Sequence, residues 1–488
     1  MSATISPSQS ISTGSPQAVP EISAAEIDAS CRAPVMLLFL SAAGWVLASS
    51  FFGIIASLKF HKPVMLADYS WLTYGRVHPA ASNALVYGFG LQAGLGVLLW
   101  LVAHLGRTKL ASAPLVIAGW LFWNVGVTLG ILGIIGGDST GYEMLELPRY
   151  ASVPMFFGYL GIGLAGMLTF HQRRERELYI SQWFLLAALF WFPWIYSSAN
   201  LLLVAKPVRG VMQAVIDAWY ANNLTTVWFG LVGLGAAFYL IPKITKRPLA
   251  SHYLGLFTFW TLIIFGSWSR VPAGAPVPAW LPALSTFAAV LTLVPILAVA
   301  VNVKQTLCGY SGSEGCNPAL KFIAFGMAAY VLSGLMSVGA SLGRVSKITN
   351  FTWFVPAQMQ LVIYGFFAMT MFGAIYYIVP KLTQREFCKP KMVAAHFWLA
   401  MLGIVLYAAP LAIGGVKQGL ALNDAKTPFL DVVTGTLPFL RASTTGDLLM
   451  AVGHLIFLMN LAGLLVKLGH ASYKTAMSLN TKAAGVAS

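Results

Sequence analysis

The sequence predicts an all-α integral membrane protein, built as a bundle of twelve transmembrane helices. Hydrophobic residues make up 58% of the chain and charged residues only 9%, and the mean hydropathy is +0.75. Apolar stretches of about twenty residues, the length that crosses a hydrocarbon core of roughly 30 Å, recur along almost the whole chain. Lipid is therefore the expected solvent for most of the molecule.

Each apolar stretch is long enough to cross the bilayer as a helix. The expected spans, in order, are 34–57, 79–104, 113–136, 152–170, 180–205, 218–241, 252–269, 280–302, 319–342, 352–379, 392–416 and 446–468. They define a membrane domain over residues 34–470. The longest connections on the side opposite the termini are 58–78, 137–151 and 417–445, and we expect solvated loops there.

The two ends of the chain are expected to lie outside the bundle. Residues 1–33 are rich in Ser, Ala and Pro and carry no basic segment before an apolar one. We therefore expect a disordered cytoplasmic tail there and no cleaved signal peptide. Residues 471–488 are expected to form a second cytoplasmic tail.

The distribution of Lys and Arg predicts the orientation of the bundle. An even number of spans places both termini on one side, where the loops and tails hold 18 of the 30 basic residues, against 12 on the other side. Positively charged loops stay in the cytoplasm, so we expect both termini there, in a bacterial inner membrane. The net charge of +15 is spread over loop ends without an aromatic-interleaved patch, which favours contact with membrane lipid over nucleic acid.

Several segments carry a resemblance to a known family. They are Gly75–Arg76, Ser82–Gly90, Trp219–Asn223, Phe238–Lys243, Phe259–Trp260, Phe372–Pro380, His396–Trp398, Leu402–Tyr407 and Gln418–Leu420. Together they resemble the catalytic subunit I of the cbb-type (C-family) haem-copper oxidases, from the second span to the twelfth. The resemblance implies the twelve-helix bundle of the cytochrome c oxidase subunit I type.

The resemblance also implies cofactors, which are haem b groups and a copper ion held by six histidines. Neutral imidazole suits both iron and copper, so a count of histidines at the matching positions tests function directly. The low-spin haem histidine of the second span falls on Ala81, and the copper histidine of the sixth span falls on Asn222. Alanine cannot ligate iron.

The remaining four ligand positions are substituted as well. An adjacent histidine pair expected at the end of the seventh span falls on Pro272 and Ala273, and the redox tyrosine expected earlier in that span falls on Gly266. The His-x-His run of the tenth span falls on Gln358 and Gln360. We therefore predict a degenerate site with no catalytic residue, no metal ligand and no bound cofactor.

Only two of the eight histidines lie close enough to a span interior to be considered as ligands. These are His78, three residues before Ala81, and His454 in the middle of the twelfth span. His78 could hold a single haem, although an interfacial histidine before Pro79 is the simpler interpretation. His454 is an intramembrane ionisable group, and we expect a hydrogen-bonded packing residue. The others are placed in loops or at span ends, namely His61, His104, His171, His252, His396 and His470.

Four amides lie in the expected interior, at the place of the family's cofactor cavity. Gln358, Gln360, Asn222 and Asn223 need hydrogen-bond partners or water there, since an unsatisfied buried amide costs about 1–3 kcal/mol. We expect them to bond one another across the sixth and tenth spans, and a polar ligand or water path is the alternative. Arg441 matches an arginine near the haem propionates in the family, and contact with an anion or with Asp431 or Asp447 would explain it equally well.

Three hypotheses about function follow. The first is a cofactor-less structural or assembly subunit that pairs with a membrane-anchored cytochrome c-type subunit or with other respiratory subunits. The second is a cytochrome c-linked oxygen or nitric oxide reductase that retains haem on His78. The third is conduction of protons or a small ligand through the emptied cavity. Fold alone does not choose among them, because activity belongs to the site.

Overall fold

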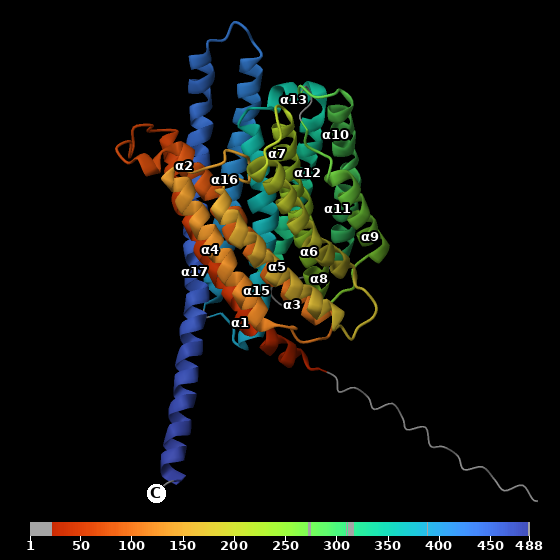
Figure 1. Cartoon of the computed structure of the whole chain (residues 1–488), viewed down its shortest axis with the longest axis vertical. Helices are drawn as coiled ribbons and strands as arrows, with labels where there is room; N and C mark the ends of the chain where they lie inside the picture. The colour runs from red at the N-terminus through yellow and green to blue at the C-terminus, as the bar shows by residue number, and fades with distance from the viewer. Residues whose placement is uncertain (1–21, 272–274, 309, 311–316, 388, 487–488) are drawn as a thin grey trace, which may run out of the picture.

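The computed structural model describes residues 22–486 apart from 272–274, 309, 311–316 and 388. Figure 1 shows a bundle of long helices, with the beginning of the first helix and the C-terminus at the same end. The described residues contain helices and no strand. The predicted all-α membrane bundle is confirmed.

The elements follow the predicted spans closely. The first half of the chain contains α1 (Ala24–Lys59), η1 (Ser70–Leu72), α2 (Tyr74–Asn83), η2 (Ala84–Gly90), α3 (Leu91–Leu105), α4 (Ala113–Gly136), α5 (Arg149–His171), α6 (Ile180–Ala199), η3 (Asn200–Ala205), α7 (Met212–Asn222), η4 (Asn223–Trp228) and α8 (Phe229–Thr245). The second half contains α9 (His252–Thr261), η5 (Leu262–Gly266), α10 (Trp280–Leu291), α11 (Leu293–Leu307), α12 (Pro318–Ser341), α13 (Gly343–Thr349), α14 (Phe354–Gln360), η6 (Leu361–Ala368), α15 (Met369–Thr383), α16 (Pro390–Leu422) and α17 (Phe429–Val486). η1 is a short 3₁₀-helix and η2 to η6 are π-helices.

Among the described residues, eleven continuous helical segments are long and apolar enough to cross a membrane. A twelfth apolar helix, His252–Gly266, is shorter and occupies the place of the seventh predicted span. It ends in the π-helix η5, and a turn over residues 267–270 follows it. The chain is an integral membrane protein with one helical segment for each predicted span.

Three of these segments form the centre of the bundle. The most apolar windows of Tyr74–Leu105, Met212–Thr245 and Phe354–Thr383 are 100%, 89% and 89% buried, whereas the windows of the other long segments are 33–44% buried. The outer helices therefore present more than half of these windows to the surroundings, as lipid-facing helices do. Side chains on the three central segments face other protein groups, which makes them the place for a site.

Helix α1 begins earlier than predicted, so the expected tail of residues 1–33 is helical from residue 24 onward, while residues 1–21 lie outside the described residues. Ser23 Oγ caps this start by accepting a hydrogen bond from the backbone N–H of Glu26, and Asp28 anchors the turn that follows. Its Oδ1 accepts hydrogen bonds of 2.8 Å from both Trp100 Nε1 and His104 Nε2. This buried polar contact ties the first turns of α1 to the end of α3.

The predicted 417–445 loop is mostly helical. Helix α16 continues to Leu422 and α17 begins at Phe429, so only residues 423–428 connect them. The hairpin projects beyond the neighbouring loops, at the end of the bundle opposite the termini (Figure 1). At 58 residues, α17 is about 87 Å long at 1.5 Å per residue, nearly three times a hydrocarbon core. It also makes most of the expected tail at 471–488 helical, as far as residue 486.

Candidate functional site

The three central segments carry four of the six predicted ligand positions. In each segment a π-helix begins within three residues after a ligand position. Ala81 precedes η2 by three residues, Asn222 is followed at once by η4, and Gln360 is followed at once by η6. A π-helical turn inside an α-helix is uncommon and often lies at a functional site. Each of the three spans therefore has, beside a predicted ligand position, a backbone irregularity of the kind that often accompanies a functional site.

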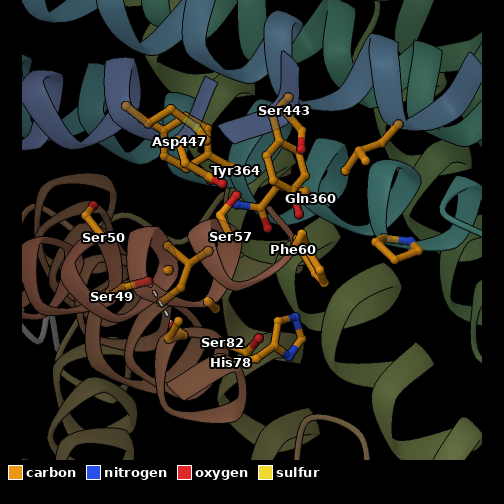
Figure 2. A pocket seen from close by; sticks show the side chains of 18 of the residues that line it. Ser49, Ser50, Ser57, Phe60, His78, Ser82, Gln360, Tyr364, Ser443 and Asp447 are labelled. Atoms are coloured by element: carbon orange, nitrogen blue, oxygen red, sulfur yellow. Dashed lines mark hydrogen bonds between the residues drawn. The ribbon is translucent and has the colours of Figure 1, made fainter. Parts of the chain in front are cut away.

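The first cavity lies between α1, the start of α2, the α14–η6 junction, α16 and α17, and we call it the histidine cavity. Its volume is about 120 Å³. The side chains that line it and enter the argument below are Ser57, Phe60, Tyr74, His78, Ala81, Trp353, Gln360, Tyr364, Tyr407, Asp447 and His454. Figure 2 shows Gln360, Tyr364 and Asp447 on one side of this cavity and His78 and Ser82 on the other.

Ala81 and Gln360, two of the predicted positions, both line the histidine cavity. The amide of Gln360 is only partly buried, and among the described residues it has no hydrogen-bond partner. Its polar atoms are therefore open to whatever fills the cavity. These two positions come from spans 2 and 10, so the fold brings together residues that are far apart in sequence.

His454 is held tightly at the inner wall of the same cavity. Its Nδ1 lies 2.6 Å from Ser50 Oγ and its Nε2 lies 2.8 Å from Tyr364 OH. Both ring nitrogens therefore have partners, as expected for a hydrogen-bonded packing residue. Because both nitrogens are engaged, His454 has no free lone pair to offer to a metal in this arrangement.

His396 was predicted to lie at a span end, and this prediction was wrong. It lies inside α16 with no exposed surface, and its Nδ1 is 3.0 Å from Tyr376 OH. Helices α15 and α17 cover this end of α16, so the position is interior although it is only six residues from the helix start. Its Nε2 has no hydrogen-bond partner among the described residues.

His78 lines the histidine cavity, on α2. Its ring stacks on Tyr74, with ring centroids 5.2 Å apart, and no hydrogen bond to another described residue is formed. It is one imidazole at the cavity wall, opposite the amide of Gln360 (Figure 2). The predicted position of a residual ligand is therefore accessible, but a second imidazole does not face it.

The second cavity lies between α7, α10, α12 and α14, and we call it the hydroxyl cavity. Its volume is about 470 Å³, within the usual range of small-molecule sites. Asn222 and Gln358, two further predicted positions, both line it. Serine and threonine hydroxyls make up much of the rest, from Thr225, Thr226, Ser269, Ser285, Thr286, Ser337, Ser341, Ser346 and Thr352.

The expected hydrogen bonds between the amides of spans 6 and 10 are not formed. Asn222 Nδ2 donates to the carbonyl oxygen of Gly266 at 2.7 Å, and Asn223 Nδ2 donates to the carbonyl of Ser267 at 3.1 Å. Gly266 is the last residue of the π-helix η5 and Ser267 follows it, so both carbonyls lie at the helix end, where they lack intrahelical partners. Gln358 has no hydrogen-bond partner among the described residues, so its amide is free to face the cavity.

Gly266 is the position expected for the redox tyrosine, and its carbonyl contacts the side chain at the expected copper position, Asn222. The two matched positions are thus neighbours in space. Pro272 and Ala273 lie outside the described residues.

Arg441 is exposed on α17 and, among the described residues, forms no ion pair with Asp431 or Asp447. Burial of His61 lowers the pKa of its imidazole, and the positive charge of Arg441 lowers that pKa further.

Residues 137–148 form a cap at the end of the central helices opposite the termini. Burial raises the pKa of the Glu146 carboxyl to about 7, although Asn83 Nδ2 donates a 2.8 Å hydrogen bond to its Oε2. Glu143 forms an ion pair of 3.3 Å with Arg270 at the rim of the hydroxyl cavity. Glu146 is therefore enclosed beside Asn83 of the second span, and Glu143 is paired with Arg270, which follows the seventh span.

The sequence indicated Asp447 only as a possible partner of Arg441, and it did not indicate Glu146 at all. Asp447 lies within a stretch that reads as the start of an ordinary apolar span, and Glu146 within a loop. A carboxylate inside a predicted span is a signal for a site in principle. For Glu146 no sequence signal existed, because its burial depends on how the loop folds back over Asn83.

The fold and the two cavities define a polytopic helical membrane protein whose polar cavities lie between its central spans and the helices packed against them. The sequence profile of the family "Cytochrome C and Quinol oxidase polypeptide I" matches residues 33–449. The chain therefore belongs to this family, the subunit I family of the haem-copper oxidases.

Individual relatives agree. The chain is 26% identical over 452 residues to the "Cytochrome c oxidase subunit 1 homolog" of Azorhizobium caulinodans, covering 88% of this chain and 81% of that protein. It is 25% identical over 438 residues to the "Cbb3-type cytochrome c oxidase subunit CcoN1" of Stutzerimonas stutzeri, covering 86% and 90%. A solved structure of a heme-copper terminal oxidase dimer matches with a TM-score of 0.65 and 13% identity over 87% of this chain and 84% of that one, which shows the shared fold.

Proposed function

We propose that this chain is a member of the cbb-type branch that works without haem or copper, as a structural or assembly subunit of a respiratory membrane complex. The observation that carries the proposal is the contrast between a kept framework and changed side chains. The bundle, the π-helices and the pairing of matched positions around two cavities are present. Imidazole is absent from the four matched positions that the structure describes, namely Ala81, Asn222, Gln358 and Gln360.

The residues present fit neither cofactor. A methyl group cannot ligate iron, and amide side chains are poor replacements for the imidazoles that hold haem iron and copper. Among the described residues, no group of three or more His, Cys, Asp or Glu side chains could hold a metal ion. The histidine cavity, at about 120 Å³, is also well below the 300–1,000 Å³ of ordinary small-molecule sites, and a porphyrin is a large ligand.

The first test is an absorption spectrum with metal analysis of the purified full-length protein, produced where haem and copper are plentiful. We expect no Soret band and no stoichiometric iron or copper, because the matched positions lack ligands. A matched preparation of a cbb-type oxidase from the same host controls for cofactor supply. Stoichiometric haem would refute the proposal and favour a reductase with haem on His78, which His78→Ala would then abolish.

Conduction through the cavities is a second candidate, favoured by the unbonded amides of Gln358 and Gln360. If protons or a small polar solute pass here, substitution of both glutamines by leucine should abolish flux into proteoliposomes. A wild-type flux no larger than that of empty liposomes would dismiss this candidate. Unchanged flux in the double variant would place any path elsewhere.

We also propose that both termini face the cytoplasm of a bacterial inner membrane, and that the partners are membrane lipid and other respiratory subunits, among them a membrane-anchored cytochrome c-type subunit. The positive-inside bias supports this orientation. Asp424 lies at the exposed tip of the α16–α17 hairpin and Gln384 is exposed at the other end of the bundle.

The orientation gives a direct labelling prediction. In a chain with the native cysteines replaced, Asp424→Cys should react with a membrane-impermeant maleimide added to intact spheroplasts. Gln384→Cys should react only after the membrane is opened. The reverse pattern would show that the termini face outward.

A further inference from the structure

Asp447 is a carboxylate that faces the histidine cavity without a cation beside it. Its neighbour is the Ser57 hydroxyl, and among the described residues no Lys, Arg or His side chain forms an ion pair with it. A carboxylate withdrawn from water is costly unless it is paired with a positive charge or takes up a proton. In the empty cavity this carboxyl can take up a proton, and a positively charged occupant would replace that proton as its partner.

Aromatic rings gather at the outer end of the same cavity. The ring of Phe60 lies 4.9 Å from that of Trp353 and 5.1 Å from that of Tyr74, measured between centroids. Tyr407 also lines the cavity, near Asp447. Rings of this kind attract a cation through their faces, and a group of them is the usual recognition element for organic ammonium ions.

The size of the cavity limits the occupant. An engineered cavity of about 150 Å³ holds benzene, so about 120 Å³ accommodates roughly five non-hydrogen atoms. The other titratable side chains that face it are His78, His454, Tyr74, Tyr364 and Tyr407, and His454 already has both nitrogens bonded. Apart from a protonated His78, nothing in the lining competes with a cationic ligand.

We propose that the histidine cavity binds a small organic ammonium ion, with Asp447 as its counter-ion and the rings of Phe60, Tyr74 and Trp353 closing over it. Serine hydroxyls and the free Gln360 amide oxygen accept the ammonium N–H groups. Phe60 follows the end of α1 and Tyr74 begins α2, so the ligand enters from the side opposite the termini. The inference rests on the proposed function, because a haem in this cavity would displace the ligand.

The test uses the full-length protein in detergent, with ethylammonium chloride as the probe and ethanol and sodium chloride as controls of size and ionic strength. Calorimetry should show saturable binding of ethylammonium and none of ethanol, and the melting temperature should rise with ethylammonium alone. Asp447→Asn should weaken binding at least about tenfold, since the charge attraction is lost. Asp431→Asn, an exposed carboxylate on the same helix, should leave binding unchanged.

Trp353→Leu supplies an independent variant if Asp447→Asn does not fold to a single species, and it should weaken ethylammonium binding several-fold. Absence of saturable binding to the wild type, equal binding of ethanol, or unchanged binding in either variant would overturn the inference. A Soret band in the same preparation would instead refute the proposed function. A colourless protein that fails to bind ethylammonium refutes the ammonium site alone.

Discussion

Replacement of Gly419 by alanine should destabilise the protein more than any other single methyl addition in the α16–α17 hairpin. A Cβ at this position would overlap the backbone carbonyl oxygen of Ile348 in α13, and a backbone atom cannot rotate away as a flexible side chain can. Overpacking of this kind costs about 1–3 kcal/mol and more where the backbone must shift. The melting temperature of the detergent-solubilised protein should fall, with loss of the monodisperse species on size exclusion.

The chain offers a matched control at Gly435. This residue lies in α17, and a Cβ there would meet no atom within 4 Å. Because alanine favours a helix over glycine by about 0.5–1 kcal/mol, Gly435→Ala should leave the melting temperature unchanged or raise it. Equal behaviour of the two variants would mean that α16 does not pack against α13 at this closeness.

Replacement of Glu146 by glutamine should stabilise the protein at alkaline pH. Burial raises the pKa of Glu146 from its ordinary 4.5 to about 7, so the folded state holds this proton more tightly than the unfolded state. Stability then falls as the pH rises from about 4.5 and reaches its floor above about 7. The charged form costs on the order of 3 kcal/mol above that pH.

Glutamine keeps an acceptor for Asn83 Nδ2 and carries no charge, so Glu146→Gln should remove this fall. The melting temperature of the variant should match the wild type near pH 4 and exceed it at pH 8. Glu386→Gln, at an exposed carboxylate in the connection after α15, should keep the wild-type pH dependence. A variant at position 146 with the wild-type slope would show that this carboxyl is not enclosed in the folded protein.

The membrane spans could be predicted because length and hydropathy decide them. The ends of the helices could not, since they depend on contacts between distant residues. Asp28 extends α1 into the expected tail because Trp100 and His104 donate to it. Helices α16 and α17 extend through an expected loop because each supports the other above the bundle (Figure 1).

The site was predictable only as a set of positions. Matching the sequence to the family pattern identified Ala81 and Gln360, and the structure brings both to one cavity. It could not reveal that Asn222 bonds to the backbone of Gly266, because that depends on a π-helix whose amino acid pattern resembles any apolar helix. Nor could it reveal that His396 is interior, since neighbouring helices, and not the local sequence, cover that turn.

The π-helices of the three central spans also act as phase shifts. A π-turn accommodates one more residue than the α-turn it replaces, so the side chains before it are rotated by about 100° relative to those after it, compared with an uninterrupted helix. In Phe354–Thr383, this lets Gln358 and Gln360 face the two cavities while Phe366 to Phe372 remain in the apolar core. One inserted residue thus separates the cavity-lining residues of this span from its core-packing residues. Substitutions such as those at Gln358 and Gln360 can therefore change the cavity lining without disturbing the packing of the bundle.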